Sequence, residues 1–194
     1  MKILAISGSH RKGGNTKILL NEVLKECKKA GAEVELVELA GIDIKYCQGH
    51  DSSFCREKGC IYNDEGGEVL EKMEKADTII IGSPVYLGTV TSKLKALIDR
   101  SVILRRKGFK LEYKIGAAVA VGGYHGGGQE ITLLTINNFF GIHNMTIVPD
   151  GKDKSHFGVA AVGGEVGDVK SDKHGMQLAR NIGKRIIEEL RLRK

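Results

Sequence analysis

Hydrophobic residues follow two patterns along the chain, one typical of strands and one typical of helices, and the two patterns alternate. Short, nearly continuous apolar runs are typical of strands buried on both faces, and they stand at residues 3–6, 78–82, 115–121 and 145–148. In residues 33–39 carboxylates largely alternate with apolar side chains, which indicates a half-exposed edge strand. Apolar residues recur at helical spacing over residues 16–30, 67–75, 91–104 and 129–140, and again from residue 172. The pattern predicts five strands that alternate with helices.

This alternation predicts one parallel sheet with helices on both faces. Five strands with the second at the edge suit the order 2-1-3-4-5, the three-layer α/β sandwich of flavodoxin-like folds. Ligands of such folds bind beyond the carboxyl ends of the strands, at the switch point between the first and third strands. The loops after the first, third and fourth strands are rich in glycine and would all meet there.

Length and composition narrow the class of protein. A chain of 194 residues suits one domain over residues 1–194 rather than two. No segment resembles a signal peptide, and no apolar run approaches the ~20 residues that span a bilayer. We therefore expect a soluble, cytoplasmic protein with no membrane partner. The net charge of +6 is modest, and basic residues gathered at 105–114 and at the C-terminus are typical of a solvated face.

The loop at residues 7–16 leads from a strand into a helix, so its amides lie at a helix N-terminus, which attracts anions. Donors and positive charge come from Ser7, Ser9, Arg11, Lys12, Asn15 and Thr16, and Gly8, Gly13 and Gly14 let N–H groups turn inward. Gly14-Asn15-Thr16 stands where an NTPase loop carries Gly-Lys-Ser/Thr, and the dinucleotide fingerprint is absent. A terminal phosphomonoester remains as the ligand. The alternative is a turn that binds nothing.

The loops at 83–88 and 122–128 suit a flat, partly polar ring. Pro84 fixes the chain direction, Gly88 allows close approach, and apolar bodies stand beside the backbone at Val85, Tyr86 and Leu87. Each loop alone has an ordinary turn as its alternative. A phosphate at one end and a ring at the other describe FMN.

Three segments resemble the NADPH-dependent FMN reductase and iron-sulfur flavoprotein family. They are Gly-Ser-His-Arg-Lys-Gly-Gly-Asn-Thr at 8–16, Ser-Pro-Val-Tyr-Leu-Gly at 83–88 with Lys95 and Asp99-Arg100 after it, and Gly-Gly-Gly-Gln-Glu at 126–130. The resemblance extends to about residue 149. It implies that the first loop binds the FMN phosphate and that the other two contact the ribityl chain and isoalloxazine. The cofactor-binding residues it implies are Ser9, Arg11, Lys12, Gly13, Asn15, Thr16, Pro84, Val85, Tyr86, Leu87, Gly88, Gly122, Gly123, Tyr124, His125 and Gly126.

The resemblance also implies a homodimer or homotetramer with FMN near a subunit interface. The predicted helix at 129–140 fits this expectation, because its apolar residues cover more than one face.

The four cysteines divide into two groups. Cys27 falls on the apolar face of the first helix, which predicts a place in the core. Cys47, Cys55 and Cys60 share the loop at 47–60, where a reducing cytosol favours free thiols or metal ligands over disulfides. This loop resembles the compact cluster motif of the iron-sulfur flavoproteins. It departs from that motif because His50 stands at the second cysteine position and the gap after it is longer.

The departure leaves three interpretations of the cysteine loop. A 4Fe-4S cluster is normally held by four thiolates, so its ligands here would be Cys47, Cys55 and Cys60 with a fourth group still to be found. Zinc accepts three Cys and one His, and the spacing equals that of a zinc knuckle with His and Cys exchanged at the middle positions. The third interpretation is unmetallated thiols, with His50 a solvated loop residue.

The resemblance implies a redox flavoenzyme, an NAD(P)H-dependent FMN reductase or quinone reductase. Electrons would pass from NAD(P)H or a reduced iron-sulfur protein through FMN to a quinone, a flavin or another acceptor. No side chain is assigned as a catalytic acid or base, because the chemistry is the cofactor's.

Two other functions compete with this one. A non-enzymatic flavin or iron-sulfur electron carrier is the first, and a pI near 9.1 argues mildly against it because flavodoxin-type carriers are commonly acidic. A nucleic-acid binder with a zinc knuckle is supported by spacing and charge alone, and we expect no nucleic-acid partner.

Overall fold

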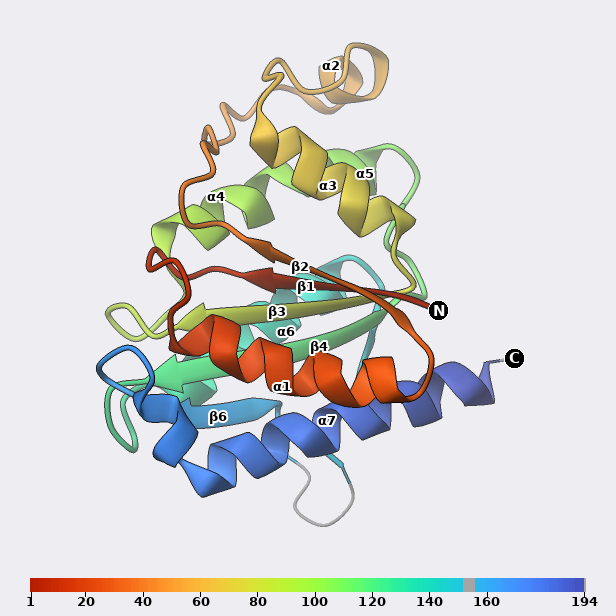
Figure 1. Cartoon of the computed structure of the whole chain (residues 1–194). Coiled ribbons are helices and arrows are strands. Elements are labelled where there is room, and N and C mark those ends of the chain that lie inside the picture. Colours follow the sequence, from red (N-terminus) through yellow and green to blue (C-terminus); the bar gives the residue numbers. More distant parts are fainter. Residues whose placement is uncertain (152–155, 194) are drawn as a thin grey trace.

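The computed structural model describes residues 1–151 and 156–193 and contains one parallel sheet between layers of helices (Figure 1). Its strands are β1 (Lys2–Ser7), β2 (Glu33–Glu38), β3 (Thr78–Pro84), β4 (Ile115–Gly122), β5 (Thr146–Ile147) and β6 (Val159–Val162). The order is β2-β1-β3-β4-β5, and β6 also pairs with β4. The predicted fold class and strand order are confirmed, with β2 at the edge.

Helices cover both faces of the sheet. On one face lie α1 (Asn15–Lys29) and α7 (Lys173–Leu192), side by side in Figure 1. The other face is covered by α3 (Glu65–Lys75), α4 (Ser92–Arg100), α5 (Val102–Arg106) and α6 (Gln129–Ile142). A further short helix, α2 (Ser52–Glu57), lies in the cysteine loop and was not predicted. None of the described helices has the length and apolar character needed to cross a membrane.

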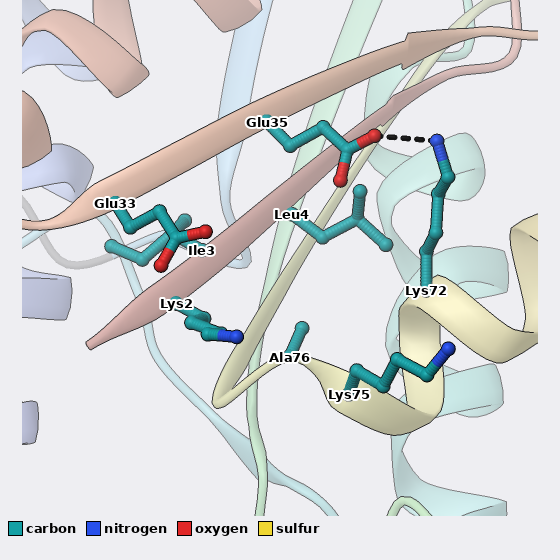
Figure 2. A pocket seen from close by; sticks show the side chains of 8 residues that line it. All are labelled: Lys2, Ile3, Leu4, Glu33, Glu35, Lys72, Lys75 and Ala76. Carbon is teal, nitrogen blue, oxygen red and sulfur yellow. Dashed lines mark hydrogen bonds and ion pairs between the residues drawn. The ribbon is translucent and has the colours of Figure 1, made fainter.

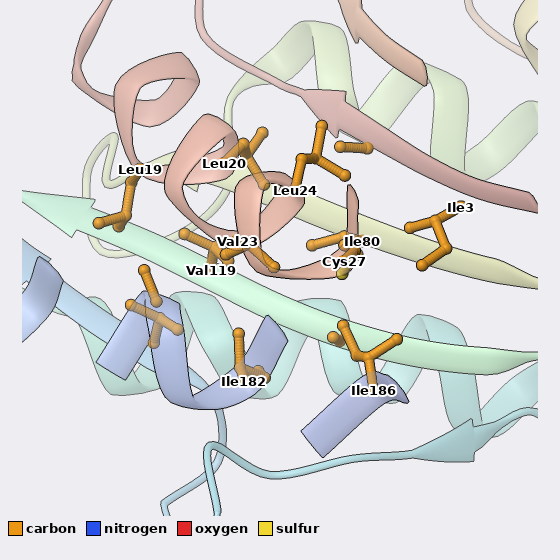
Figure 3. Close-up of a cluster of buried hydrophobic side chains, with 14 of the residues drawn as sticks. Ile3, Leu19, Leu20, Val23, Leu24, Cys27, Ile80, Val119, Ile182 and Ile186 are labelled. Carbon is orange, nitrogen blue, oxygen red and sulfur yellow. The ribbon is translucent and has the colours of Figure 1, made fainter. Parts of the chain in front are cut away.

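Strand residues alternate between the two helix layers because successive side chains point to opposite faces. Ile3 and Ala5 of β1 pack with α1 and α7, whereas Leu4 and Ile6 pack with the opposite layer. Figure 3 shows the first of these cores, where α1 and α7 contribute Leu19, Leu20, Val23, Leu24, Ile182 and Ile186.

Cys27 lies in this same core and has no exposed surface. Burial raises the pKa of its thiol to about 12, so the thiol stays neutral. The predicted core role of Cys27 is confirmed, and its chemistry is separate from that of the other three cysteines.

A fifth strand was predicted over residues 145–148, but the structure has a shorter strand there and a sixth strand beside it. Strand β5 covers two residues and pairs with the start of β4, at Ile115 and Gly116. The second half of β4 pairs with β6 instead. The glycine-rich segment that follows Pro149 thus holds β6, and a short 3-10 helix, η1 (Asp168–Ser171), comes after β6. Residues 152–155 of that segment and the predicted C-terminal cation Lys194 lie outside the described residues.

The predicted helix at 91–104 is two helices, α4 and α5, which meet at Ser101. The hydroxyl of Ser101 donates to the carbonyl of Ile98 at 2.6 Å, a bond that competes with the helical ladder and bends helices. This junction directs α5 toward the cysteine loop, because α2 packs on α5.

Packing between β4 and α6 generates the first prediction. A Cβ placed on Gly116 would lie 2.5 Å from the Phe140 ring, so we expect Gly116→Ala to lower the free energy of unfolding by about 1–3 kcal/mol through overpacking. Gly141 in α6 has open space around it, so Gly141→Ala should raise that free energy by about 0.5–1 kcal/mol. Urea unfolding measures both variants, and equal destabilisation in the two would contradict the packing argument.

Candidate functional site

The loops after β1, β3 and β4 meet beyond the carboxyl ends of the strands, as predicted. A pocket of about 170 Å³ lies between them. Its lining includes eight residues that the sequence singled out, Ser9, Arg11, Asn15, Thr16, Pro84, Val85, Tyr86 and Gly123, and three that it did not, Val121, Gly163 and Gly164. The other predicted residues lie in the same loops but outside this wall, at Lys12, Gly13, Leu87, Gly88, Gly122, Tyr124, His125 and Gly126.

The first loop presents the start of α1 to the pocket. Helix α1 begins after Gly14 with no side-chain cap, and its first backbone bond runs from Ile18 N–H to the Gly14 carbonyl. The first N–H groups of the helix, at residues 15–17, therefore have no helical acceptor and are available to an anion, together with the positive end of the helix dipole. Ser9 is buried, and its hydroxyl accepts from the Arg11 N–H at 3.0 Å, which closes the loop.

Glu38, at the end of β2, reaches into the same loop. One carboxylate oxygen accepts from the Gly13 N–H at 2.7 Å and the other from the Lys17 ammonium at 2.6 Å. Partial burial opposes its charge, but these hydrogen bonds outweigh burial and hold the pKa of Glu38 below its usual value. The Gly13 N–H and the Lys17 charge, both near the predicted anion site, are therefore engaged within the protein.

Asn15 joins the first loop to the segment at 163–167. Its amide nitrogen donates to the carbonyls of Gly163 at 3.0 Å and Glu165 at 2.7 Å, and its amide oxygen accepts from the Gly167 N–H at 2.7 Å. Arg11 adds a bond to the Gly164 carbonyl at 3.1 Å. The side chain of Asn15, predicted as a ligand donor, thus holds a wall of the pocket together, and its contact with a ligand stays a prediction.

The second loop is a tight turn that presents two unusual residues. Tyr86 and Thr89 exchange backbone hydrogen bonds of 2.9 and 3.1 Å, and the residues between them, Leu87 and Gly88, both have positive φ. Leu87 has a φ of 48° and a fully exposed side chain. A non-glycine residue in this conformation is strained, and an apolar side chain gains nothing by lying in water. The turn thus projects the Leu87 side chain into solvent at the carboxyl edge of the sheet.

The third loop is held open by glycine and by Gln129. The side-chain amide of Gln129 donates to the Tyr124 carbonyl at 2.8 Å, and it lies so close to Gly122 that a Cβ there would clash. Tyr124 and His125 are exposed. His125 and Gly126 line a separate hollow beside β6 rather than the pocket between the three loops.

The three loop cysteines and His50 lie around a second, small pocket, together with Tyr62 and Arg100. Cys55 is buried, Cys47 is half-buried and Cys60 is exposed, and all three are free thiols. The Gly49 N–H donates to the Cys47 sulfur at 3.5 Å, and His50 stacks on Phe54 with ring centres 4.7 Å apart. The predicted candidates are thus brought together.

Two arginines that the sequence analysis did not assign point at these sulfurs. Nη1 of Arg106 lies 3.1 Å from the Cys55 sulfur, and Nη2 of Arg100 lies 3.5 Å from the Cys60 sulfur. The Arg100 side chain is almost completely buried and paired with Asp64. Burial disfavours the charge of Arg100, but Asp64 and Cys60 outweigh it and raise the pKa of the guanidinium. Both guanidinium groups therefore lie within contact distance of a thiol sulfur.

The arrangement of the thiols bears on what they could hold. Across residues 1–151 and 156–193, no three His, Cys, Asp or Glu side chains are grouped so that they could bind a single metal ion. The described residues therefore show no preformed metal site, and the cluster, zinc and free-thiol interpretations stay predictions.

A further hollow lies at the opposite end of the strands. Figure 2 shows that it is lined by the start of β1, by Glu33 and Glu35 of β2, and by the end of α3. Lys72 and Glu35 pair across it at 2.5 Å. Cations and anions alternate on its walls, and it is remote from the three loops, so we assign it no ligand.

Comparison with known proteins agrees with this geometry. An iron-sulfur flavoprotein of Methanocaldococcus jannaschii is 46% identical over 193 residues, covering 99% of this chain and 98% of the relative. An iron-sulfur flavoprotein of Methanosarcina thermophila is 40% identical, covering 99% and 96%. Among solved structures, RosB with a bound riboflavin-5'-phosphate derivative aligns with a TM-score of 0.76 at 22% identity, covering 99% of this chain and 79% of RosB.

The WrbA-like flavodoxin of Agrobacterium tumefaciens aligns with a TM-score of 0.67 at 19% identity, covering 100% of this chain and 98% of that protein. At such identities the two structures support the fold alone. The family model for NADPH-dependent FMN reductase matches residues 1–182. The chain therefore belongs to the NADPH-dependent FMN reductase family.

Proposed function

We propose that this protein is an FMN-dependent oxidoreductase that takes electrons from NAD(P)H or a reduced iron-sulfur protein and passes them to a quinone, a flavin or another acceptor. One observation carries the proposal: the loops after β1, β3 and β4 enclose one pocket, with the uncapped start of α1 on its wall. Membership of the NADPH-dependent FMN reductase family supports FMN as the flavin.

The phosphate would lie at the start of α1. Backbone N–H groups of Asn15 and Thr16, the hydroxyl of Ser9 and the guanidinium of Arg11 are the donors that line the pocket there. Lys12 does not line the pocket but adds positive charge near it. Gly13, with a φ of 69°, allows the loop to turn there. Arg11 is the principal cation in this proposal.

The ring would lie over the second and third loops. Pro84, Val85 and Tyr86 would form one side, with Gly88 allowing close approach, and the loop that carries Gly122, Gly123 and Gly126 would form the other. Leu87, Tyr124 and His125 are exposed at the rim, where they could cover the ring and exclude water. When bound, FMN supplies the hydride and electron chemistry, and backbone N–H groups would stabilise charge that develops on it.

The cysteine loop belongs to the same proposal. We infer that Cys47, Cys55 and Cys60 are ligands of a 4Fe-4S cluster, because two relatives that match nearly the whole chain are iron-sulfur flavoproteins. The contacts of Arg106 and Arg100 with two of the sulfurs support this, since a cluster on thiolates carries negative charge. The fourth ligand is unassigned, and His50 is its candidate.

The proposed assembly is a cytoplasmic homodimer or homotetramer. Ile131, Leu134 and Ile142 of α6 are exposed, as a subunit contact on that helix would require.

The reductase function is tested on protein purified without oxygen. We expect bound or added FMN to lose its visible absorbance on addition of NADPH or NADH and to regain it with a quinone. Retained FMN that exchanges single electrons with protein partners, without NAD(P)H oxidation and without turnover of a quinone or free flavin, would favour the non-enzymatic carrier. Failure to bind FMN at all would refute the proposed site.

Binding of FMN and riboflavin separates the phosphate contact from the ring contact. We expect Arg11→Gln to weaken FMN affinity about tenfold, the effect of losing one hydrogen bond to a charged group, and to leave riboflavin affinity within twofold. Lys25→Gln, on an exposed part of α1, is the matched control. Equal weakening of both flavins by Arg11→Gln would mean that Arg11 acts through Gly164 rather than on the phosphate.

Iron, zinc and acid-labile sulfide in the anaerobic protein test the cluster. We expect about four iron and four sulfide per chain in the parent protein, with loss of both in Cys47→Ser, Cys55→Ser and Cys60→Ser. Cys27→Ala is the control, because Cys27 lies in the core away from the loop. Zinc without sulfide, or no metal in the parent protein, would each reject the cluster.

A further inference from the structure

A carboxylate stands beside the loop at 7–16, where the FMN phosphate is proposed to bind. Glu38 is the last residue of β2, and 13% of its side chain is exposed. Its two oxygens accept from the Gly13 N–H at 2.7 Å and from the Lys17 ammonium at 2.6 Å. Desolvation opposes the charge, but these two hydrogen bonds outweigh it and hold the pKa of Glu38 below its usual value. The protein thus places negative charge of its own beside a loop that suits an anion.

The contacts of Glu38 reduce the number of groups that a ligand could use. Gly13 carries a backbone donor in the turn before α1, and Lys17 is a cation of the first turn of that helix, yet both are bonded to Glu38. The charge of Lys12 also acts on this carboxylate and helps to lower its pKa. Arg11 differs from these groups, because it donates to a neutral backbone carbonyl and keeps its charge for an anion.

The order of the strands places Glu38 beyond the phosphate end of the proposed flavin. The ring would lie over the loops after β3 and β4, and the phosphate would lie at the loop after β1. Strand β2 lies beside β1 on the side away from β3 and β4 (Figure 1). Glu38 is in register with Ser7, the last residue of β1. A group attached to the phosphate would therefore extend toward the end of β2, where Glu38 stands.

We propose that Glu38 is a specificity-determining residue that restricts the site to a flavin monophosphate and excludes a flavin with a second phosphate, as in FAD. The inference rests on the proposed FMN function. The second phosphate of FAD lies beside a carboxylate, and the nearest N–H group and cation are already bonded to that carboxylate. Because Glu38 is mostly buried, solvent and salt screen this repulsion poorly.

Competition between the two flavins tests the inference and needs no flavin-free protein. The full-length protein is equilibrated with mixtures of FMN and FAD, and chromatography of the bound flavins gives the ratio of the two affinities. We expect the parent protein to prefer FMN by about tenfold or more. Glu38→Gln keeps an oxygen for the Gly13 N–H but removes the charge, so it should lower this preference about fivefold.

Lys17→Gln separates the charge of Glu38 from its structural role. Both variants break the ion pair of these residues, so a purely structural role would move the preference in the same direction in both. Lys17→Gln leaves the carboxylate without its cation, and we expect it to raise the preference for FMN about threefold. Glu35→Gln is the matched control, because this carboxylate of β2 pairs with Lys72 in the hollow of Figure 2 and should change the ratio less than about twofold.

The possible outcomes separate this inference from the proposed function. Equal affinity of the parent protein for FMN and FAD would overturn the inference and leave FMN binding intact. An unchanged ratio in Glu38→Gln, or a shift in the same direction in Lys17→Gln, would overturn it as well. Should Glu38→Gln not fold, an unchanged or lowered preference for FMN in Lys17→Gln rejects the inference. Failure of the parent protein to bind either flavin would refute the proposed FMN site itself, and this inference with it.

Discussion

The side-chain amide of Asn15 joins the first turn of α1 to the segment at 163–167, and the pocket at the carboxyl edge depends on that junction. Three hydrogen bonds of 2.7–3.0 Å use both ends of the amide, and the side chain is nearly buried. An unpaired amide there would cost about 1–3 kcal/mol, so each segment stabilises the other. The wall is consequently built by the protein itself, before any ligand is bound.

The sheet could be predicted from sequence wherever packing and local pattern agree. Residues 78–82 and 115–121 are continuous apolar runs because β3 and β4 are covered on both faces, and such runs have few other interpretations. Strand β6 was not predicted, because its four residues lie inside a glycine-rich stretch and show too little of a hydrophobic pattern. Its place is decided by hydrogen bonds to β4, and these pair residues about 40 positions apart.

The site was predictable in its backbone and less so in its side chains. Glycines and neutral donors mark the first loop, since the chain there must turn closely at a helix start. The engagement of Asn15 with Gly163 and that of Arg106 with Cys55 join residues 148 and 51 positions apart. No local periodicity reports such contacts. The thiols themselves were visible in the sequence, but the two guanidinium groups that contact Cys55 and Cys60 required the fold.

Glu38 limits how much negative charge the loop at 7–16 can accept from a ligand. Its carboxylate occupies the Gly13 N–H and neutralises Lys17, so two groups that could serve a second phosphate are already used. Adding further negative charge beside Glu38 would repel that carboxylate, whose lowered pKa keeps it ionised near neutral pH. In the proposed function, the uncapped amides of α1 and the Arg11 guanidinium would remain for one phosphate group. This balance would explain, in physical terms, why a loop that resembles an NTPase turn in outline is proposed to hold a monophosphate.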